Sequence, residues 1–333
     1  MKKKTFIIAE AGINHNGKIS QAKKLVDAAV KSGADAIKFQ TFLATSLATQ
    51  TAKKVDYQKR YDRNESMLQM LKKNELTFNQ FSIIKKYCDK KKIEFISSAF
   101  DEESIIFLKK LRLRYFKIPS GEITNYPLLK IISKLNKKVL ISTGMSNIKE
   151  IKKTFILLQK LGLKKKNIII MQCNSTYPAP VNQLHLNVIR TFKKKFKTFV
   201  GFSDHSENIL APSIAVAMGA EFIEKHFTIS KSLKGPDHFF SLNPNQFKSM
   251  VENIRYTENM MGKINKFVTK NELENRSISR KSIVAKNKIK KGEKFTIYNL
   301  TTKRPGNGIS PMNWTKVIGQ KAKRNYKIDD QIK

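Results

Sequence analysis

Short apolar segments alternate with amphipathic segments along residues 5–262, and this alternation is the strongest constraint on the fold. Eight segments have the length and composition of buried strands: 5–9, 36–40, 93–97, 115–118, 138–142, 167–171, 198–201 and 221–225. The segments that follow them have helical periodicity: 20–31, 77–90, 102–111, 126–135, 148–161, 185–195, 209–218 and 245–262. Strands and helices that alternate in this way form a parallel sheet, and eight such units predict a closed (β/α)₈ TIM barrel.

Two regions depart from this pattern. Residues 43–75 form a long connection, which is usually either functional or locally ordered. After residue 264 the chain becomes polar, and we expect a linker over 265–276 followed by a small domain of short strands over 277–333. A domain of roughly 60 residues is marginally stable alone, so it is expected to dock on the barrel domain (residues 1–264) or on a partner chain.

The chain is strongly basic, with 65 Lys and Arg against 26 Asp and Glu and a formal net charge of +39. Such an excess is typical of nucleic-acid-binding proteins, and this function is retained as an alternative. However, the lysines are spread along the whole chain, and no aromatic-interleaved basic patch or zinc-finger spacing occurs. This distribution favours a lysine-rich surface and an anionic substrate.

The sequence also indicates where the protein resides. Cys88 and Cys173 are too few for a disulfide framework and lack metal-type spacing, which predicts a reducing, cytoplasmic environment. The apolar runs are shorter than the roughly 20 residues that span a bilayer, so no membrane partner is expected. The basic N-terminus leads into a short apolar run that Glu10 interrupts, which predicts a first strand rather than a signal peptide.

Polar side chains gather where the predicted strands end, and this is the end of a barrel where active sites lie. Lys38 and Gln40 are two residues apart and therefore share a face of their strand. A set of lysines and serines occupies equivalent strand ends: Lys38, Lys117, Ser120, Ser142, Ser175 and Ser203. Each serine alone could cap the following helix. Together, the ammonium and hydroxyl groups suit a substrate that carries a phosphate and a carboxylate.

Two histidines end neighbouring strands. His205 and His226 follow the seventh and eighth strand segments, and their imidazoles could hold one divalent metal. Glu10 ends the first strand and is a candidate acid/base group. The alternative for Glu10 is a buried carboxylate paired with Lys38.

Several motifs, in order along the chain, resemble those of the sialic acid (N-acetylneuraminate) synthase family. They occupy residues 8–15, 37–40, 117–122, 142–145, 203–205, 224–228, 235–238 and 303–308. The resemblance implies a TIM barrel followed by an antifreeze-like (SAF) domain. It also implies condensation of phosphoenolpyruvate with N-acetylmannosamine, which gives N-acetylneuraminate and phosphate by C–O cleavage. The family's metal is commonly Mn²⁺, with Mg²⁺ or Co²⁺ as alternatives.

The resemblance also assigns roles to individual residues. Glu10, His205 and His226 would be catalytic, and the two histidines would also hold the metal. Phosphoenolpyruvate would be bound by Lys38, Lys117, Ser120, Ser142, Ser175 and Ser203. The sugar would be bound by Gln40, Tyr177, Asp237 and Arg304. Arg304 lies in the SAF segment, which implies a domain-swapped homodimer. The same motifs serve a close alternative, in which a 2,4-diacetamido-trideoxyhexose gives a legionaminic-type acid.

Overall fold

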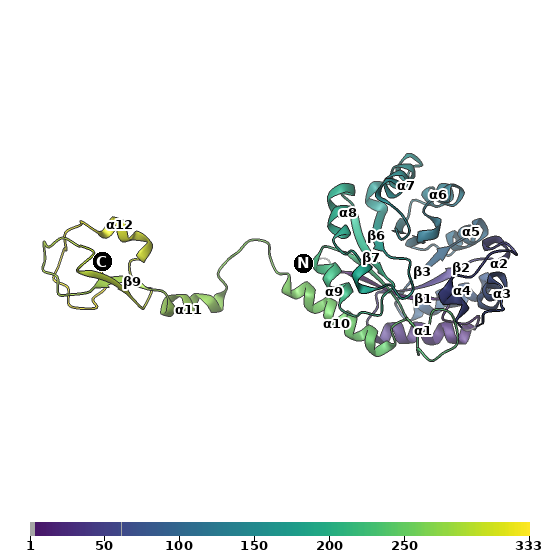
Figure 1. The fold of residues 1–333 in the computed structure, drawn as a ribbon, viewed down its shortest axis with the longest axis horizontal. Helices are drawn as coiled ribbons and strands as arrows, with labels where there is room; N and C mark the ends of the chain where they lie inside the picture. The colour runs from purple at the N-terminus through teal and green to yellow at the C-terminus, as the bar shows by residue number, and fades with distance from the viewer. Residues whose placement is uncertain (1–3, 61) are drawn as a thin grey trace. The chain divides into compact units, whose positions relative to one another are not determined.

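The N-terminal part of the chain forms a closed barrel of eight parallel strands in a computed structural model that describes residues 4–60 and 62–333 (Figure 1). The strands follow sequence order around the barrel, and β8 pairs with β1. They are β1 (Phe6–Gly12), β2 (Ala36–Thr41), β3 (Glu94–Ala99), β4 (Tyr115–Ile118), β5 (Lys138–Ser142), β6 (Ile168–Cys173), β7 (Phe199–Asp204) and β8 (Phe222–His226). The predicted (β/α)₈ architecture is confirmed.

Helices surround the barrel, as Figure 1 shows. They are α1 (Ile19–Lys31), α4 (Phe78–Lys90), α5 (Glu102–Lys110), α6 (Tyr126–Ser133), α7 (Ile148–Lys160), α8 (Val188–Phe196), α9 (Ala211–Ala217) and α10 (Pro244–Met260). Several start at a side-chain cap, such as Asn147 in α7 and Asn243 in α10. The predicted start of α8 at residue 185 is wrong, because His185 has a φ of 45° that a right-handed helix cannot include.

The inside of the barrel has an apolar half and a polar half. Alternate residues of each strand point inward, and toward the strand starts these include Ile8, Ile96, Leu140 and Phe222, which pack into one buried cluster. A second and larger apolar cluster fills the layer between the barrel and its helices. The inward residues near the strand ends are polar, so the core itself confines the candidate site to the open end of the barrel.

The long connection after β2 is locally ordered, as expected. It contains α2 (Ala44–Leu47), the 3₁₀ helix η1 (Asp56–Lys59) and α3 (Met67–Asn74). Phe42, Met70 and Leu71 pack with Ile13 in a small core of their own. The core therefore joins α2 and α3, the helices on either side of η1, to the segment that follows β1.

The chain divides into two compact units, of which the second covers Lys263–Lys333. That unit contains α11 (Lys270–Ser279), η5 (Pro311–Asn313), α12 (Trp314–Val317), and the antiparallel strands β9 (Ser282–Ala285) and β10 (Leu300–Lys303). Ile283, Phe295 and Tyr326 contribute to its separate apolar core. The predicted small C-terminal domain is confirmed, but the segment predicted as a polar linker contains most of α11, whose residues are all exposed.

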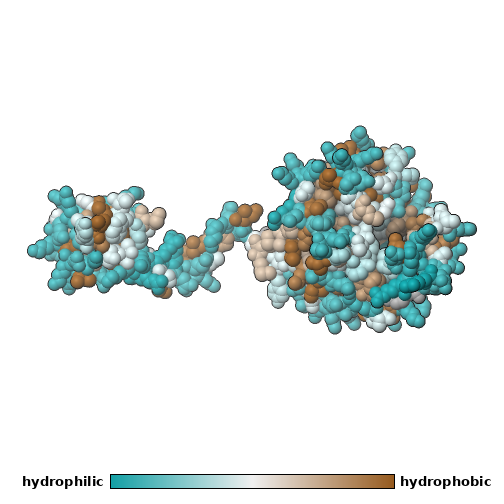
Figure 2. Space-filling view, viewed as in Figure 1, coloured by the Kyte–Doolittle hydropathy of each residue, from teal (hydrophilic) through white to brown (hydrophobic). Residues whose placement is uncertain are grey.

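The visible surface in Figure 2 is mostly hydrophilic, with scattered apolar side chains. Within residues 4–60 and 62–333, no helix combines the length and hydropathy needed to cross a bilayer.

Candidate active site

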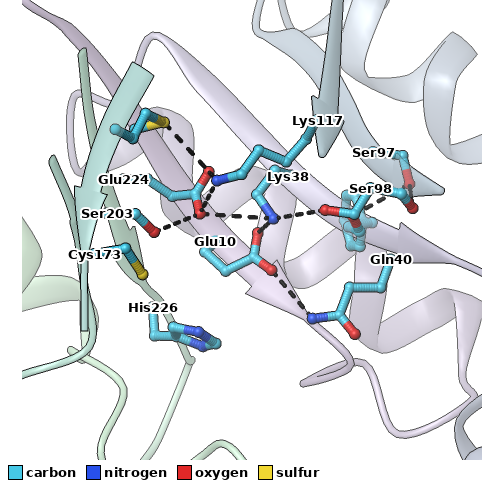
Figure 3. A network of polar contacts seen from close by, with 12 residues as sticks. Glu10, Lys38, Gln40, Ser97, Ser98, Lys117, Cys173, Ser203, Glu224 and His226 are labelled. Atoms are coloured by element: carbon cyan, nitrogen blue, oxygen red, sulfur yellow. Dashed lines mark hydrogen bonds and ion pairs between the residues drawn. The ribbon is translucent and has the colours of Figure 1, made fainter. Parts of the chain in front are cut away.

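Strand register brings Glu10, Lys38 and His226 side by side at the barrel mouth. Glu10 is paired in register with Lys38 on β2 and with His226 on β8. Lys38 Nζ lies 2.7 Å from Glu10 Oε2 and donates a 3.1 Å hydrogen bond to Ser98 Oγ, as Figure 3 shows. Burial raises the pKa of Glu10 although Lys38 opposes this shift. Glu10 therefore forms the ion pair with Lys38 that was the alternative interpretation, and its pKa is shifted upward, the direction that a general acid requires.

Glu224 lies at the centre of the charged cluster and was not predicted as a site residue. Both of its carboxylate oxygens lie 2.7 Å from Lys117 Nζ, and Oε1 lies 3.8 Å from Lys38 Nζ (Figure 3). Ser203 donates a 3.0 Å hydrogen bond to the same Oε1. Burial alone would raise the pKa of Glu224, but the two lysines and these hydrogen bonds outweigh it and lower the pKa to about 2. The position of Glu224, two residues before His226, could have indicated its inward direction.

The predicted serine hydroxyls lie beside these lysines. Ser120, Ser142 and Ser203 line a cavity of about 60 Å³ together with Lys38 and Lys117. Oγ of Ser142 is buried and has no hydrogen-bond partner in the described part of the chain. Because buried hydroxyls are normally paired, this orphaned group beside two ammonium groups indicates a site for an anion.

Ser175 lies outside this cavity but close to Gly144. Its Oγ is likewise buried and unpartnered among the described residues. A Cβ at Gly144 would lie 2.1 Å from Ser175 Oγ and 2.9 Å from Ser120 Oγ, so only glycine leaves room for the two hydroxyls. The amide of Gly144 donates a 3.0 Å hydrogen bond to Ser120 Oγ. Gly144 therefore allows Ser120 and Ser175 to approach each other.

The two imidazoles predicted to hold a metal lie next to each other, with ring centroids 5.3 Å apart. Nδ1 of His205 donates a 2.6 Å hydrogen bond to the Asn174 carbonyl, so Nε2 is the nitrogen left to bind a metal once the ring is neutral. Burial alone would lower the pKa of His205, but the neighbouring Cys173 and this hydrogen bond outweigh it and raise the pKa. Nδ1 of His226 is buried with no hydrogen-bond partner in the described ranges. Burial, and then the neighbouring His205, lower the pKa of His226 well below its usual range. His226 is therefore neutral, which is the form that binds metal.

These donors fit a divalent ion bound by two protein ligands. Across residues 4–60 and 62–333, no three or more His, Cys, Asp and Glu side chains converge closely enough to hold an ion. His205 and His226 would therefore leave further coordination positions to water or substrate, as catalytic sites do.

Cys173 and Asp237 flank the two histidines. Cys173 Sγ lies 3.8 Å from His205 Nδ1, a proximity that the spacing of the two cysteines does not predict. Burial raises the pKa of the Cys173 thiol, but His205 outweighs this effect and lowers the pKa to about 7. Asp237 Oδ2 lies 3.9 Å from His226 Nδ1, and burial with the nearby Glu10 raises the pKa of Asp237 to about 7.

The predicted sugar-binding residues of the barrel unit also meet at the mouth. Glu10, Gln40 and Asp237 converge on Gly12, whose φ of +51° favours glycine. A Cβ added to Gly12 would lie 3.3 Å from Glu10 Oε1 and 3.4 Å from both Asp237 Oδ2 and Gln40 Nε2. Tyr177 stacks on His205 with a centroid distance of 4.2 Å. Gln40, Tyr177 and Asp237 therefore surround the same space as Glu10 and the histidines.

An aromatic wall extends this space outward. Tyr57 of η1 lies 4.8 Å from Tyr177 and 5.9 Å from Phe240, measured between ring centroids. Tyr57 and Tyr177 line a cavity of about 520 Å³ that also includes Gln40 and Ser120. This volume lies within the range of about 300–1,000 Å³ typical of small-molecule sites. The sequence did not single out Tyr57, because it lies in the connection after β2 and follows no strand.

Arg304 lies in the C-terminal unit, directly after β10, and is exposed. Its contact with the sugar stays a prediction of the family resemblance.

A closed barrel with paired lysines, carboxylates and imidazoles at its strand ends has the organisation of a (β/α)₈-barrel enzyme. The sequence model of the NeuB family matches residues 25–266, and that of the SAF domain matches residues 280–333. The chain belongs to the NeuB family, which confirms the resemblance described above.

Individual relatives are similar over almost the whole chain. An N,N'-diacetyllegionaminic acid synthase of Campylobacter jejuni is 48% identical and covers 99% of both chains. A protein of the same name from Legionella pneumophila is 40% identical, with 96% of this chain and 91% of that protein covered. The crystal structure of an N-acetylneuraminic acid (sialic acid) synthetase from Leptospira borgpetersenii has a TM-score of 0.72 and 30% identity, with 82% of this chain and 90% of that chain covered.

Proposed function

We propose that this protein condenses phosphoenolpyruvate with an N-acetylated amino sugar to give a nine-carbon 2-keto acid and phosphate. The observation that carries the proposal is the pair of buried lysines, Lys38 and Lys117, beside the unpartnered hydroxyl of Ser142. The family membership supports the same chemistry.

The charged cluster would bind phosphoenolpyruvate when its lysines exchange their glutamate partners for the anionic groups of the substrate. Lys38 and Lys117 are held in place by Glu10 and Glu224, so their ammonium groups are oriented before a substrate arrives. The carboxylate and phosphate of phosphoenolpyruvate would then contact these ammonium groups and the serine hydroxyls. Preorganised positive groups of this kind stabilise negative charge at low reorganisation cost.

The reaction joins C3 of phosphoenolpyruvate to the aldehyde carbon of the open-chain sugar. The electron pair of the aldehyde moves to its oxygen, which takes a proton. Water adds to C2 of the donor, and phosphate leaves from the resulting tetrahedral carbon by C–O cleavage. Glu10, with its raised pKa and its place beside Gln40 and Asp237, would transfer a proton at the aldehyde oxygen. A divalent metal held by His205 and His226, Mn²⁺ or else Mg²⁺ or Co²⁺, would polarise that aldehyde.

For the sugar we propose a 2,4-diacetamido-trideoxyhexose, which would give a legionaminic-type acid. The larger cavity at the mouth includes Val55, Phe100, Pro119 and Met145 among its lining residues. These apolar side chains suit a sugar that has a methyl group in place of a hydroxymethyl group and carries a second acetamido methyl. The similarity to the Campylobacter protein supports the same choice.

N-acetylmannosamine is the second candidate, and would make the product N-acetylneuraminate. The similarity to the Leptospira synthetase supports it, and both sugars share the aldehyde chemistry. We further propose that the protein acts in the cytoplasm as a homodimer.

A sugar panel tests these proposals. Phosphate release from phosphoenolpyruvate is measured with each sugar in the presence of Mn²⁺, and the product is identified by mass spectrometry. We expect kcat/KM to be at least about tenfold higher with the diacetamido sugar. A tenfold ratio of kcat/KM corresponds to about 1.4 kcal/mol of additional transition-state stabilisation. Higher kcat/KM with N-acetylmannosamine would overturn the sugar assignment. Lack of phosphate release with both sugars, together with salt-dependent binding of nucleic acid, would overturn the enzyme assignment.

A further inference from the structure

A buried ion pair lies on the outer side of the barrel, directly behind the two histidines. Lys225 falls between Glu224 and His226 on β8, so its side chain points away from the barrel interior. Its Nζ lies 2.5 Å from Oδ2 of Asp204, its register partner on β7. The side chains are 1% and 0% exposed, which excludes a solvated surface pair.

The remaining contacts of Lys225 go to the loop that follows β7. Nζ donates to the carbonyl oxygens of Ser206 at 2.5 Å and Asn208 at 3.0 Å. Asp204 accepts a 2.8 Å hydrogen bond at Oδ1 from the amide of Ser206. One ion pair therefore holds the backbone on both sides of His205, while Lys225 is itself the residue before His226.

Stability alone does not explain a buried lysine at this position. The desolvation penalty of a buried ion pair commonly exceeds the electrostatic attraction between its charges, and a protein with an apolar residue of similar size in its place is often at least as stable. An apolar residue, however, would leave the carbonyls of Ser206 and Asn208 without this donor. The structure thus places the ammonium group in contact with the strand end before His205 and with the loop after it.

We propose that Lys225, acting through Asp204 and these carbonyls, is a positioning residue that sets the relative placement of the His205 and His226 imidazoles. This inference rests on the proposed metal site. Such outer partners typically change metal affinity by about 10- to 100-fold when they are removed. Lys225 itself contacts neither substrate nor metal.

The test measures metal binding in the absence of substrates. Mn²⁺ affinity is determined from the loss of the free-ion electron paramagnetic resonance signal for wild type, Lys225→Met and Asp204→Asn. The Lys225→Met variant is expected to raise the Kd for Mn²⁺ at least about tenfold. Asp204→Asn keeps the side-chain volume and is expected to raise the Kd to a smaller extent, because its Oδ1 can still accept from Ser206. The visible spectrum of the Co²⁺-loaded variants is expected to differ from that of wild type.

Arg255→Met is the matched control for a general loss of stability. Arg255 of α10 binds the Thr5 carbonyl and Asp35, before the starts of β1 and β2 and therefore at the opposite end of the barrel. This variant is expected to lower the melting temperature and to leave the Kd for Mn²⁺ unchanged.

Each result separates the possibilities. If Lys225→Met and Asp204→Asn lower the melting temperature but bind Mn²⁺ within twofold of wild type, the ion pair is only structural and the inference is overturned. If the wild-type protein binds no divalent ion, the metal site itself and this inference fail together. If metal binding weakens in the variants while the sugar panel gives no product, the positioning role stands and the proposed reaction fails.

Discussion

Replacement of Glu224 by glutamine is expected to destabilise the barrel unit strongly, although the two side chains have nearly the same shape. The glutamine would leave the ammonium group of Lys117 buried, 2% exposed, without its carboxylate partner. It would also replace one of the two oxygens that accept from Lys117 by an amide NH2, which cannot accept a hydrogen bond. Loss of one partner from a buried ion pair typically costs about 3–5 kcal/mol.

The pKa of Glu224 gives a second estimate of the free energy that its charge contributes to folding. The value falls from 4.5 to about 2 on folding, and each pKa unit corresponds to about 1.36 kcal/mol, so the charged form of Glu224 contributes at most about 3 kcal/mol. Burial lowers the pKa of the partner Lys117, which offsets part of this contribution. Because the pKa of Glu224 is lowered in the folded state, this contribution is fully present above pH 4.5 and is lost as the pH falls toward 2. The difference between wild type and Glu224→Gln should therefore shrink by roughly 1 kcal/mol between pH 7 and pH 4.

The assay is urea unfolding followed by far-ultraviolet circular dichroism at pH 7 and pH 4. Circular dichroism is preferred because the single tryptophan, Trp314, lies in the C-terminal unit and does not report on the barrel. The double variant Lys117→Met/Glu224→Gln serves as the control, since it removes both charges and should recover more than half of the lost stability. A loss below about 1 kcal/mol for Glu224→Gln, with no recovery in the double variant, would refute the argument that this pair is mutually stabilising.

Further predictions concern the sugar contact, the metal and pH. Arg304→Ala should raise the KM for the sugar at least about tenfold, the loss of a charged hydrogen bond, and equal effects on both substrates in steady-state kinetics would contradict the predicted contact. His226→Ala should abolish turnover while circular dichroism stays native, and wild-type activity that persists in chelating buffer would count against a metal. Burial lowers the pKa of His15 to about 3 and that of His238 to about 4. Both stay neutral in the folded state while the unfolded chain takes up protons below pH 6.5. The unfolding free energy should therefore fall by at most about 1.4 kcal/mol per pH unit for each histidine between pH 6.5 and 4. Denaturation curves of His15→Gln should show a smaller pH dependence than wild type, and an unchanged dependence would refute this assignment.

Local pattern was sufficient to predict the barrel and much of its mouth. The alternation of strand and helix periodicity predicts eight parallel strands, and the two-residue period of a strand predicts that Lys38 and Gln40 share a face. Both expectations are confirmed in β2, which lines the cavity with these two residues. α8 starts later than predicted, at Val188, because the left-handed backbone at His185 leaves no mark in hydrophobic periodicity.

The electrostatics of the site depended on barrel closure. Glu224 pairs with Lys117, which is 107 positions away, because β4 and β8 face each other across the interior. Tyr57 meets Tyr177 and Phe240, although these residues lie more than a hundred positions later in the chain. Neither partner could be identified from local spacing.

The sequence by itself thus determined which side chains face the open end of the barrel, since that property follows from the period of a single strand. Only the tertiary structure decided which charges neutralise one another, which hydroxyls stay unpartnered and which lysine supports the loop that carries His205. These properties depend on distances between strands that are remote in the chain, and such distances exist only once the barrel has closed.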